Sequence, residues 1–236
     1  MLWERQLASS RPPRQPQAAA AAAAPCTGAM RQLLLAGRRA LKNEFVALRH
    51  GWSEANEAGI IVSRIESGRL PRYGLHARGR AQAAAVAEPL AALAGAREVV
   101  VLASDFSRTL DTAAVVAERL GVDVAPTPAL RERDFGDLDG GPNDTYEDVW
   151  ARDAADAGHE WSRVESVERV LARTTAAVRE ADAAGEGRLV LLVSHGDALQ
   201  ILQTAFADVD PRTHRSLPHL ETCEPRPLRV ARSNGA

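Results

Sequence analysis

Cysteine is scarce in this chain, and long apolar segments are missing. The 236 residues include two cysteines, Cys26 and Cys223, and neither has metal-ligand spacing around it. A disulfide framework is therefore not expected, and a reducing compartment fits this cysteine usage better than secretion does. No apolar run approaches the roughly 18 residues that a membrane-spanning helix needs, so we expect no membrane association. The sequence also lacks an internal repeat and a heptad pattern, which leaves the oligomeric state open.

Charge is distributed unevenly along the chain. The formal net charge is −2, yet residues 1–43 carry seven Lys and Arg and one acid, so the remainder carries a net −8. An acidic body of this kind argues against a general nucleic-acid binder. Hydrophobic residues make up 45% and charged residues 25%, which is typical of a soluble globular protein with enough length for one full core.

The N-terminal segment has a composition that predicts no fold. An Arg- and Pro-rich stretch at 11–16 is followed by an unbroken alanine run at 18–24. Such low-complexity sequence cannot bury a core. Its basic, acid-poor character is similar to an organelle transit peptide, but a disordered tail or an over-extended start upstream of Met30 also explains it. We predict a low-complexity basic extension over 1–42 and a folded domain over 43–236, in the cytoplasm or an organelle and not secreted.

Strand-like and helix-like segments alternate after residue 43. Short continuous apolar runs predict strands that are buried on both faces, at 45–48, 99–102 and 189–193, with a weaker candidate at 228–230. Apolar periodicity and glycine stops predict helices at 77–94, 107–120, 163–184 and 197–206. This alternation predicts an α/β domain, a three-layer α/β/α sandwich with a mostly parallel central sheet.

Two of the predicted strands lead directly to histidines. The 45–48 strand runs into His50 and the 189–193 strand into His195, and each histidine is followed by glycine. In open α/β sheets, ligands bind beyond the carboxyl ends of the strands. We therefore expect both imidazoles to lie at one edge of the sheet, where the glycines allow the backbone to approach a ligand closely.

Arginines accompany these histidines. Arg49 precedes His50, and Arg108 falls in the first turn of the helix predicted after the 99–102 strand. Backbone N–H groups at a helix start favour anions, and a guanidinium binds phosphate through two parallel hydrogen bonds. Two arginines and two histidines at one edge predict a compact site for a dianion.

These residues belong to an ordered set of motifs that resembles the histidine phosphatase superfamily, the phosphoglycerate-mutase-like proteins. The first motif, Arg49-His50-Gly51 with Ser53 and Asn56, is similar to the family's R-H-G-x-[ST]-x-x-N signature. The other motifs follow in the family's order: Gly74-Leu75 with Gly79, Gln82 and Ala83; Ser104 to Thr109 with Thr112-Ala113; Leu130 to Glu132 with Phe135-Gly136; Glu165-Ser166; and Ser194-His195-Gly196. The resemblance covers residues 43–232 and implies a phosphoglycerate-mutase-like fold.

The resemblance also implies a role for each matched residue. His50 would be the nucleophile that carries a phosphohistidine, and Glu132 the general acid and then base. The phosphoryl oxygens would be bound by Arg49, Arg108 and His195, with Gly196, Asn56 and Ser53 as further phosphate contacts. Neither a metal nor a cofactor is implied. Because Glu132 must be protonated to release an alkoxide as an alcohol, we expect its pKa to be raised.

Plainer explanations stand beside these roles. Glu132 lies among Arg131, Arg133 and Asp134 and could belong to a solvated charge run. Trp52 could be a wall of the pocket or a packing residue. Asp197 is most simply a helix N-cap, and as an acid beside the pocket it could also disfavour more anionic substrates.

Three functions remain open at this point. The first is hydrolysis of a small phosphomonoester, which imidazole and preorganised cations can perform without a metal. The second is phosphoglycerate-type phosphomutation, although only 62 residues separate Glu132 from His195, which looks short for a segment that closes over substrate. The third is a non-catalytic module that binds a phosphorylated metabolite or protein. The sequence does not determine the substrate.

Overall fold

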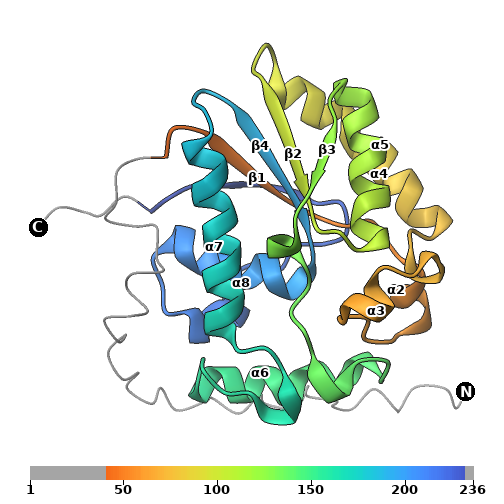
Figure 1. The fold of residues 1–236 in the computed structure, drawn as a ribbon, viewed down its shortest axis with the longest axis vertical. Coiled ribbons are helices and arrows are strands. Elements are labelled where there is room, and N and C mark those ends of the chain that lie inside the picture. The colour runs from red at the N-terminus through yellow and green to blue at the C-terminus, as the bar shows by residue number, and fades with distance from the viewer. Residues whose placement is uncertain (1–40, 232–236) are drawn as a thin grey trace, which may run out of the picture.

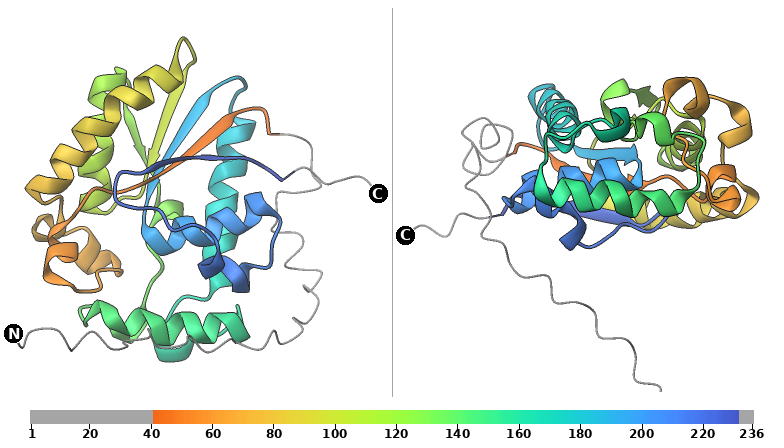
Figure 2. Two further views of the ribbon diagram at one scale, coloured as in Figure 1. Left: turned by 180° about the vertical axis from the view of Figure 1, so that it is seen from behind. Right: turned by 90° about the horizontal axis from the view of Figure 1, so that it is seen from below.

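The computed structural model describes residues 41–231, which fold around a five-stranded sheet of order β3-β2-β4-β1-β5. The strands are β1 (Glu44–Arg49), β2 (Val99–Ala103), β3 (Val124–Pro126), β4 (Leu189–Ser194) and β5 (Pro225–Leu228). The first four are parallel, and β5 runs antiparallel to β1 at one edge, where Figure 2 shows the two side by side. Pro225 and Pro227 cannot donate to a ladder, which suits an edge strand.

Two pairs of helices cover the two faces of this sheet (Figure 1). They are α4 (Ala77–Ala94) and α5 (Ser107–Leu120) on one face, and α7 (Val167–Ala183) and α8 (Gly196–Ala207) on the other. Side chains alternate along β1 accordingly: Phe45 and Ala47 pack in the core with α7 and α8, whereas Val46 and Leu48 pack with α4 and α5. The predicted three-layer sandwich with a mostly parallel sheet is confirmed.

The smaller elements gather beyond the carboxyl ends of the parallel strands (Figure 1). They are the short helices α2 (Glu54–Ala58), α3 (Ile65–Gly68) and α6 (Tyr146–Ala155) and the 3₁₀ turns η1 (Pro71–Tyr73), η2 (Pro128–Leu130), η3 (Gly136–Leu138), η4 (Asn143–Thr145), η5 (Trp161–Arg163) and η6 (Pro211–Ser216). This arrangement surrounds the strand ends with loops and short helices, as is usual for the ligand edge of an α/β sheet.

Several predicted boundaries were wrong. The helix expected from residue 163 begins at Val167, because Ser162 and Arg163 have φ of 53° and 59° and the Ser166 side chain caps the helix start. The late strand lies at 225–228, not 228–230, and the helix expected at 197–206 spans 196–207. Neither β3 nor α6 was predicted.

The predicted N-terminal extension lies almost wholly outside the described residues, so the division at residue 42 stays a prediction. Within residues 41–231, no helix combines the length and apolar character needed to cross a membrane.

Candidate active site

Three adjacent strands bring the predicted site residues together. Arg49 at the end of β1 pairs in register with Ser194 at the end of β4, and the His50 N–H donates to the Ser194 carbonyl at 3.0 Å. On the other side of β4, β2 ends at Ala103, directly before Ser104. As expected from the strand ends, the rings of His50 and His195 lie side by side, with centroids 5.2 Å apart.

The hydrogen bonds of His50 fix its tautomer. Its Nδ1 lies 2.8 Å from the Gly51 carbonyl oxygen, which can only accept, and its Nε2 lies 3.1 Å from Nε of Arg108, which can only donate. Nδ1 therefore carries the proton and Nε2 carries the lone pair. Burial, and then the charges of Arg108 and Arg49, hold the pKa of His50 well below its usual value, so the ring is neutral at pH 7.

His195 is buried and is held between two partners. Its Nδ1 lies 2.9 Å from Nη2 of Arg108 and therefore accepts, while its Nε2 lies 2.9 Å from the Ser104 hydroxyl and therefore donates. Burial and the nearby Arg108 lower the pKa of His195 well below its usual value. Because a hydroxyl can donate or accept, Ser104 can also support the other tautomer, in which Nδ1 carries a proton.

Arg108 offers unused donors at the centre of the site. It lies in the first turn of α5, as the sequence predicted, and is buried. Its Nη2 also donates to the Val62 carbonyl at 2.9 Å, but its buried Nη1 has no partner among the described residues. Burial lowers the pKa of Arg108 to about 10, which leaves it charged at pH 7. A buried cation with an unsatisfied N–H favours an anionic ligand.

Arg49 provides a second cation at the same edge. Its Nη1 lies 2.8 Å from Nε2 of His219 and donates to the Leu220 carbonyl at 3.1 Å, while its buried Nε has no partner among residues 41–231. A Cβ at Gly196 would lie 3.4 Å from the Arg49 guanidinium carbon, so the glycine lets this side chain pass close to the start of α8.

The Glu132 carboxylate is held at the start of α8 and its charge acts on Arg108, so it does not belong to a solvated charge run. Its Oε1 accepts from the backbone N–H of Arg133 at 2.9 Å and of Ala198, in the first turn of α8, at 3.1 Å. Burial, and then the charge of Asp197, raise the pKa of Glu132, whereas Arg108 opposes the shift. The expected direction of its pKa is confirmed.

Ser53 and Asn56 bind each other at the start of α2. The Ser53 hydroxyl accepts from the Asn56 N–H at 3.2 Å and the Ser53 N–H donates to Oδ1 of Asn56 at 3.1 Å, which forms a capping box. The Ser53 hydroxyl also donates to the same Oδ1 at 2.9 Å. Ser53 is fully buried in this arrangement. The Nδ2 group of Asn56 has no partner among the described residues and can still donate to a ligand. Phosphate contact by either residue stays a prediction.

The loop that carries His50 packs tightly on α4. A Cβ at Gly79 would lie 2.0 Å from the Trp52 carbonyl oxygen, and one at Gly51 would lie 2.6 Å from that of Gly79, so glycine is required at both positions. The Trp52 ring donates to Glu57 at 2.9 Å and lies under the Arg78 guanidinium, 4.3 Å from its carbon. These contacts favour packing over a pocket wall as the role of Trp52.

A buried ionic network beneath the site was not predicted. Arg133 donates two hydrogen bonds to Asp153, at 2.7 and 2.8 Å, and one to Asp197 at 3.3 Å. Asp197 also accepts from Nε1 of Trp150 at 3.0 Å. The N-cap interpretation of Asp197 is wrong, because His195 occupies that position. The Asp197 charge is buried and paired, yet it still acts on Glu132, so a bias against more anionic substrates stays a prediction.

Other residues near the site were missed as well. Arg215, His219 and Gln200 reach it from α8 and from the segment that follows α8. No local sequence signal identified them, because they are partners of residues distant in the chain. Among residues 41–231, no group of three or more His, Cys, Asp or Glu is placed to hold a metal ion.

Comparison with known proteins agrees with this geometry. The model of the histidine phosphatase superfamily, branch 1, matches residues 45–234. A protein of Enterobacter sp. (strain 638) named probable phosphoglycerate mutase GpmB is 32% identical over 182 residues, 75% of this chain and 80% of its own length. Glucosyl-3-phosphoglycerate phosphatase of Mycolicibacterium vanbaalenii is 32% identical over 172 residues, 68% of this chain and 72% of its own.

A solved structure shares both fold and sequence with the chain. The mycobacterial glucosyl-3-phosphoglycerate phosphatase solved with VO3 has a TM-score of 0.64 and 28% identity, covering 77% of this chain and 88% of that one. The match of the family model over most of the chain, together with the ordered motifs and the paired histidines, shows that the protein belongs to the histidine phosphatase superfamily, branch 1.

Proposed function

We propose that this protein is a metal-independent phosphomonoesterase that transfers the phosphoryl group of a small substrate to Nε2 of His50 and then to water. The observation that carries the proposal is the neutral His50, whose Nε2 lone pair accepts from Nε of Arg108, a guanidinium whose Nη1 has no partner among the described residues. A nucleophile next to unused cationic donors is the arrangement that phosphoryl transfer needs.

In the first step, Nε2 of His50 attacks phosphorus and the bond from phosphorus to the leaving oxygen breaks. Arg49 and Arg108 neutralise charge on the equatorial oxygens. The raised pKa of Glu132 favours its protonated form, which can pass a proton to the leaving alkoxide. The Gly51 carbonyl accepts from Nδ1 and stabilises the ring as it becomes a phosphoimidazolium.

In the second step, the Glu132 carboxylate takes a proton from water, and the resulting hydroxide attacks phosphorus. The N–P bond breaks, inorganic phosphate leaves, and His50 regains its lone pair. Glu132 also lines an open cavity of about 1050 Å³, together with residues that include Ser63, Arg131 and Arg173. Neither of the two histidines nor Arg49 or Arg108 lines this cavity, so it gives solvent access to the Glu132 side chain only.

Phosphomutation is the second candidate. It is favoured by one relative, which is named a probable phosphoglycerate mutase, whereas another is named a phosphatase. A mutase returns the phosphoryl group to an acceptor hydroxyl and must exclude water while doing so. The short segment of 62 residues between Glu132 and His195 favours hydrolysis.

The test is release of nitrophenol from p-nitrophenyl phosphate by the full chain in EDTA, compared with His50→Ala. We expect turnover by the wild type and a loss of about 10³-fold or more in the variant, because the nucleophile is absent. His76→Ala is the matched control, since His76 caps α4 outside the site and its removal should leave the rate within about twofold.

Each alternative predicts a different result. A rate that EDTA abolishes would contradict the metal-independent mechanism, and a rate that survives in His50→Ala would contradict the nucleophile. No turnover together with phosphoglycerate exchange would indicate a mutase. Phosphate binding without either activity would indicate a binding module.

A further inference from the structure

We propose that the hydroxyl group of Tyr146 is a further catalytic group, which donates a hydrogen bond to the leaving oxygen of the substrate beside Glu132. Tyr146 is the first residue of α6, a helix that has no part in the mechanism described above. The inference rests on the proposed function, because it assigns a contact in the step that transfers the phosphoryl group to His50.

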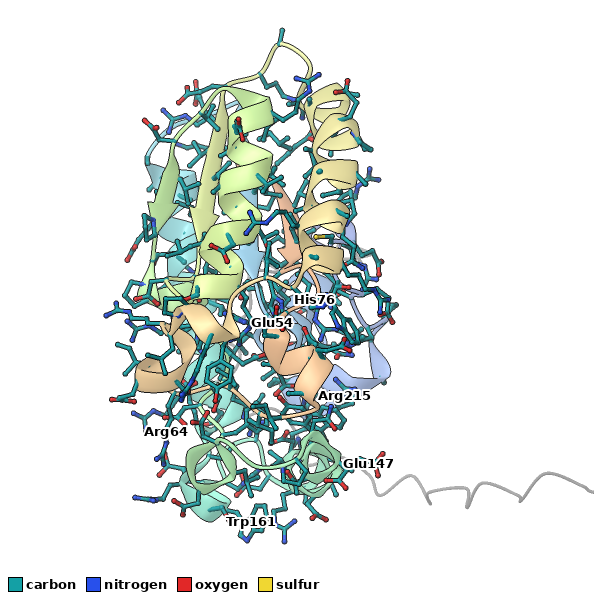
Figure 3. The ribbon with its side chains drawn as sticks, turned by 90° about the vertical axis from the view of Figure 1, so that its right-hand side faces the viewer. Glu54, Arg64, His76, Glu147, Trp161 and Arg215 are labelled. Carbon is teal, nitrogen blue, oxygen red and sulfur yellow. The ribbon has the colours of Figure 1, made fainter. Side chains whose placement is uncertain are left out.

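One face of α6 is turned toward the strand ends. Tyr146, Trp150 and Asp153 lie four and three positions apart, so they share one face of the helix, and Asp153 at its end is buried. Glu147, by contrast, is exposed and lies at the rim of the molecule in Figure 3. Because α6 lies beyond the carboxyl ends of the parallel strands (Figure 1), Tyr146 is on the side of the helix that faces the site.

Aromatic neighbours hold the Tyr146 ring in place. It stacks on Trp150, with centroids 5.4 Å and planes 11° apart, and Phe135 packs edge to face with it at 4.6 Å. Both neighbours are connected to the site, since Trp150 donates to Asp197 at 3.0 Å and Phe135 follows Glu132 by three residues. The orientation of the ring is therefore fixed before substrate binds.

The hydroxyl is the polar group of Tyr146 that this packing leaves unused. It has no hydrogen-bond partner among residues 41–231, and its oxygen is open to solvent although the ring is half-buried. A rigidly held donor without a protein partner is suited to contact with a ligand.

The charges that act on this hydroxyl are those of the phosphate site. Burial, and then the charge of Glu132, raise the pKa of Tyr146, whereas Arg108 and Arg49 oppose the shift. Tyr146 acts in turn on the Arg108 guanidinium. The phenol therefore keeps its proton at neutral pH and lies within the field of the general acid and both arginines.

This position suits the leaving group of the reaction. As the bond from phosphorus to the leaving oxygen breaks, negative charge develops on that oxygen, and Glu132 supplies the proton that it takes up. A hydrogen bond from Tyr146 to the same oxygen stabilises the developing charge, while the phenol retains its own proton. An alkoxide needs this help more than nitrophenolate does, because nitrophenolate spreads its charge over the ring.

The experiment uses Tyr146→Phe in the full chain, which keeps the ring and its stacking and removes only the oxygen. We expect kcat/KM for glycerol 3-phosphate to fall about 10- to 100-fold, the effect of one hydrogen bond to a developing charge. The loss with p-nitrophenyl phosphate should stay below about threefold. The urea midpoint of unfolding should not fall, because the hydroxyl has no protein partner to lose.

Tyr73→Phe is the matched control, since Tyr73 is the other of the two tyrosines in the chain. It lies in η1 with the Arg72 guanidinium carbon 4.9 Å from its ring centre, and its variant should keep both rates within about twofold. Full activity of Tyr146→Phe with glycerol 3-phosphate, an equal loss with both substrates, an equal loss in Tyr73→Phe or a lowered urea midpoint would each overturn the inference. An inactive wild type would contradict the proposed function and this inference together, whereas an active wild type with an unimpaired Tyr146→Phe would contradict this inference alone.

Discussion

At the scale of single residues, the site shifts the pKa values of two titratable groups, His50 and Glu132, in opposite directions. Burial among cations lowers the pKa of His50, whereas burial beside Asp197 raises that of Glu132. The two shifts favour an unprotonated imidazole and a protonated carboxyl, which are the forms that a nucleophile and a proton donor need.

The first prediction concerns the leaving group. Glu132→Gln should lower kcat/KM for an alkyl phosphate such as glycerol 3-phosphate by about 10²- to 10⁴-fold, because the alkoxide then leaves without a proton. The same variant should lose much less with p-nitrophenyl phosphate, since nitrophenolate leaves unprotonated. The wild-type rate with the alkyl phosphate should fall as pH rises through the raised pKa of Glu132, and this limb should vanish in the variant.

Two outcomes would count against the acid role of Glu132. One is an equal loss with both leaving groups, which would indicate that Glu132 only holds Ala198 and the start of α8 in place. The other is an unchanged alkaline limb in the variant. Both are read from initial rates across pH 5 to 9, and the circular dichroism spectrum of the variant, compared with the wild type, excludes a folding defect.

The site residues that could be predicted from sequence are those whose position follows from a strand end or helix start. His50 and His195 follow the buried apolar runs of β1 and β4, and Arg108 follows that of β2. Because these strands are parallel neighbours, their carboxyl ends bring the three side chains to one edge of the sheet. Arg133 and Asp197 could not be placed this way. They meet 64 positions apart in the chain, and an isolated charge in a loop has the same local pattern whether it is buried or solvated.

At the scale of elements, the Arg133 network joins three parts of the chain. Arg133 binds Asp153 of α6 and Asp197 of α8, and its Nε donates to the Glu165 carbonyl at 2.6 Å. Both carboxylates and the guanidinium are buried. The segment that carries Glu132 is therefore fixed to the helix that binds its carboxylate.

The second prediction is that Arg133→Gln lowers the free energy of unfolding by about 3–5 kcal/mol, because two buried carboxylates lose their cation. Urea unfolding followed by circular dichroism measures the change. Arg119→Gln is the control, since it breaks an ion pair with Glu88 whose side chains are 51% and 69% exposed. That loss should stay below about 1 kcal/mol. Equal losses in the two variants would show that the network does not hold these elements together.

The elements that could be predicted are those whose ends depend on nearby residues, whereas contacts between distant residues determine the others. The helices at 77–94 and 107–120 have the predicted ends, because Gly95 and Gly121 adopt positive φ and stop them locally. The start of α7 was wrong because the Ser162 carbonyl lies 2.2 Å from where a Gly136 Cβ would be, a distant contact that shapes the turn before the helix. Four of the ten residues of α6 are charged, and its buried Asp153 has its partner, Arg133, elsewhere in the chain.

At the scale of the whole molecule, the buried histidines connect catalysis to stability. Both His50 and His195 stay neutral in the folded state, since burial and Arg108 lower their pKa values. In the unfolded chain they take up protons near pH 6.5. Unfolding therefore binds protons below that pH, and stability that is fully present above it is lost as the pH falls. Glu132 acts in the opposite sense, because its raised pKa favours the folded state at acid pH and this contribution disappears as pH rises.

The last prediction follows from these opposing signs. Between pH 7 and 5, the proton uptake of two histidines on unfolding outweighs the opposite effect of one carboxyl group. The free energy of unfolding should therefore decrease as the pH is lowered, by up to about 1.4 kcal/mol per pH unit for each histidine. His195→Gln should make this decrease shallower, because it removes one group that takes up a proton on unfolding. Glu132→Gln should make it steeper, because it removes the carboxyl group that stabilises the folded state at acid pH. Urea midpoints at pH 5, 6 and 7 measure the three slopes. A His195→Gln chain that kept the wild-type slope, or a Glu132→Gln chain with a shallower one, would show that these buried groups do not govern the acid sensitivity of the fold.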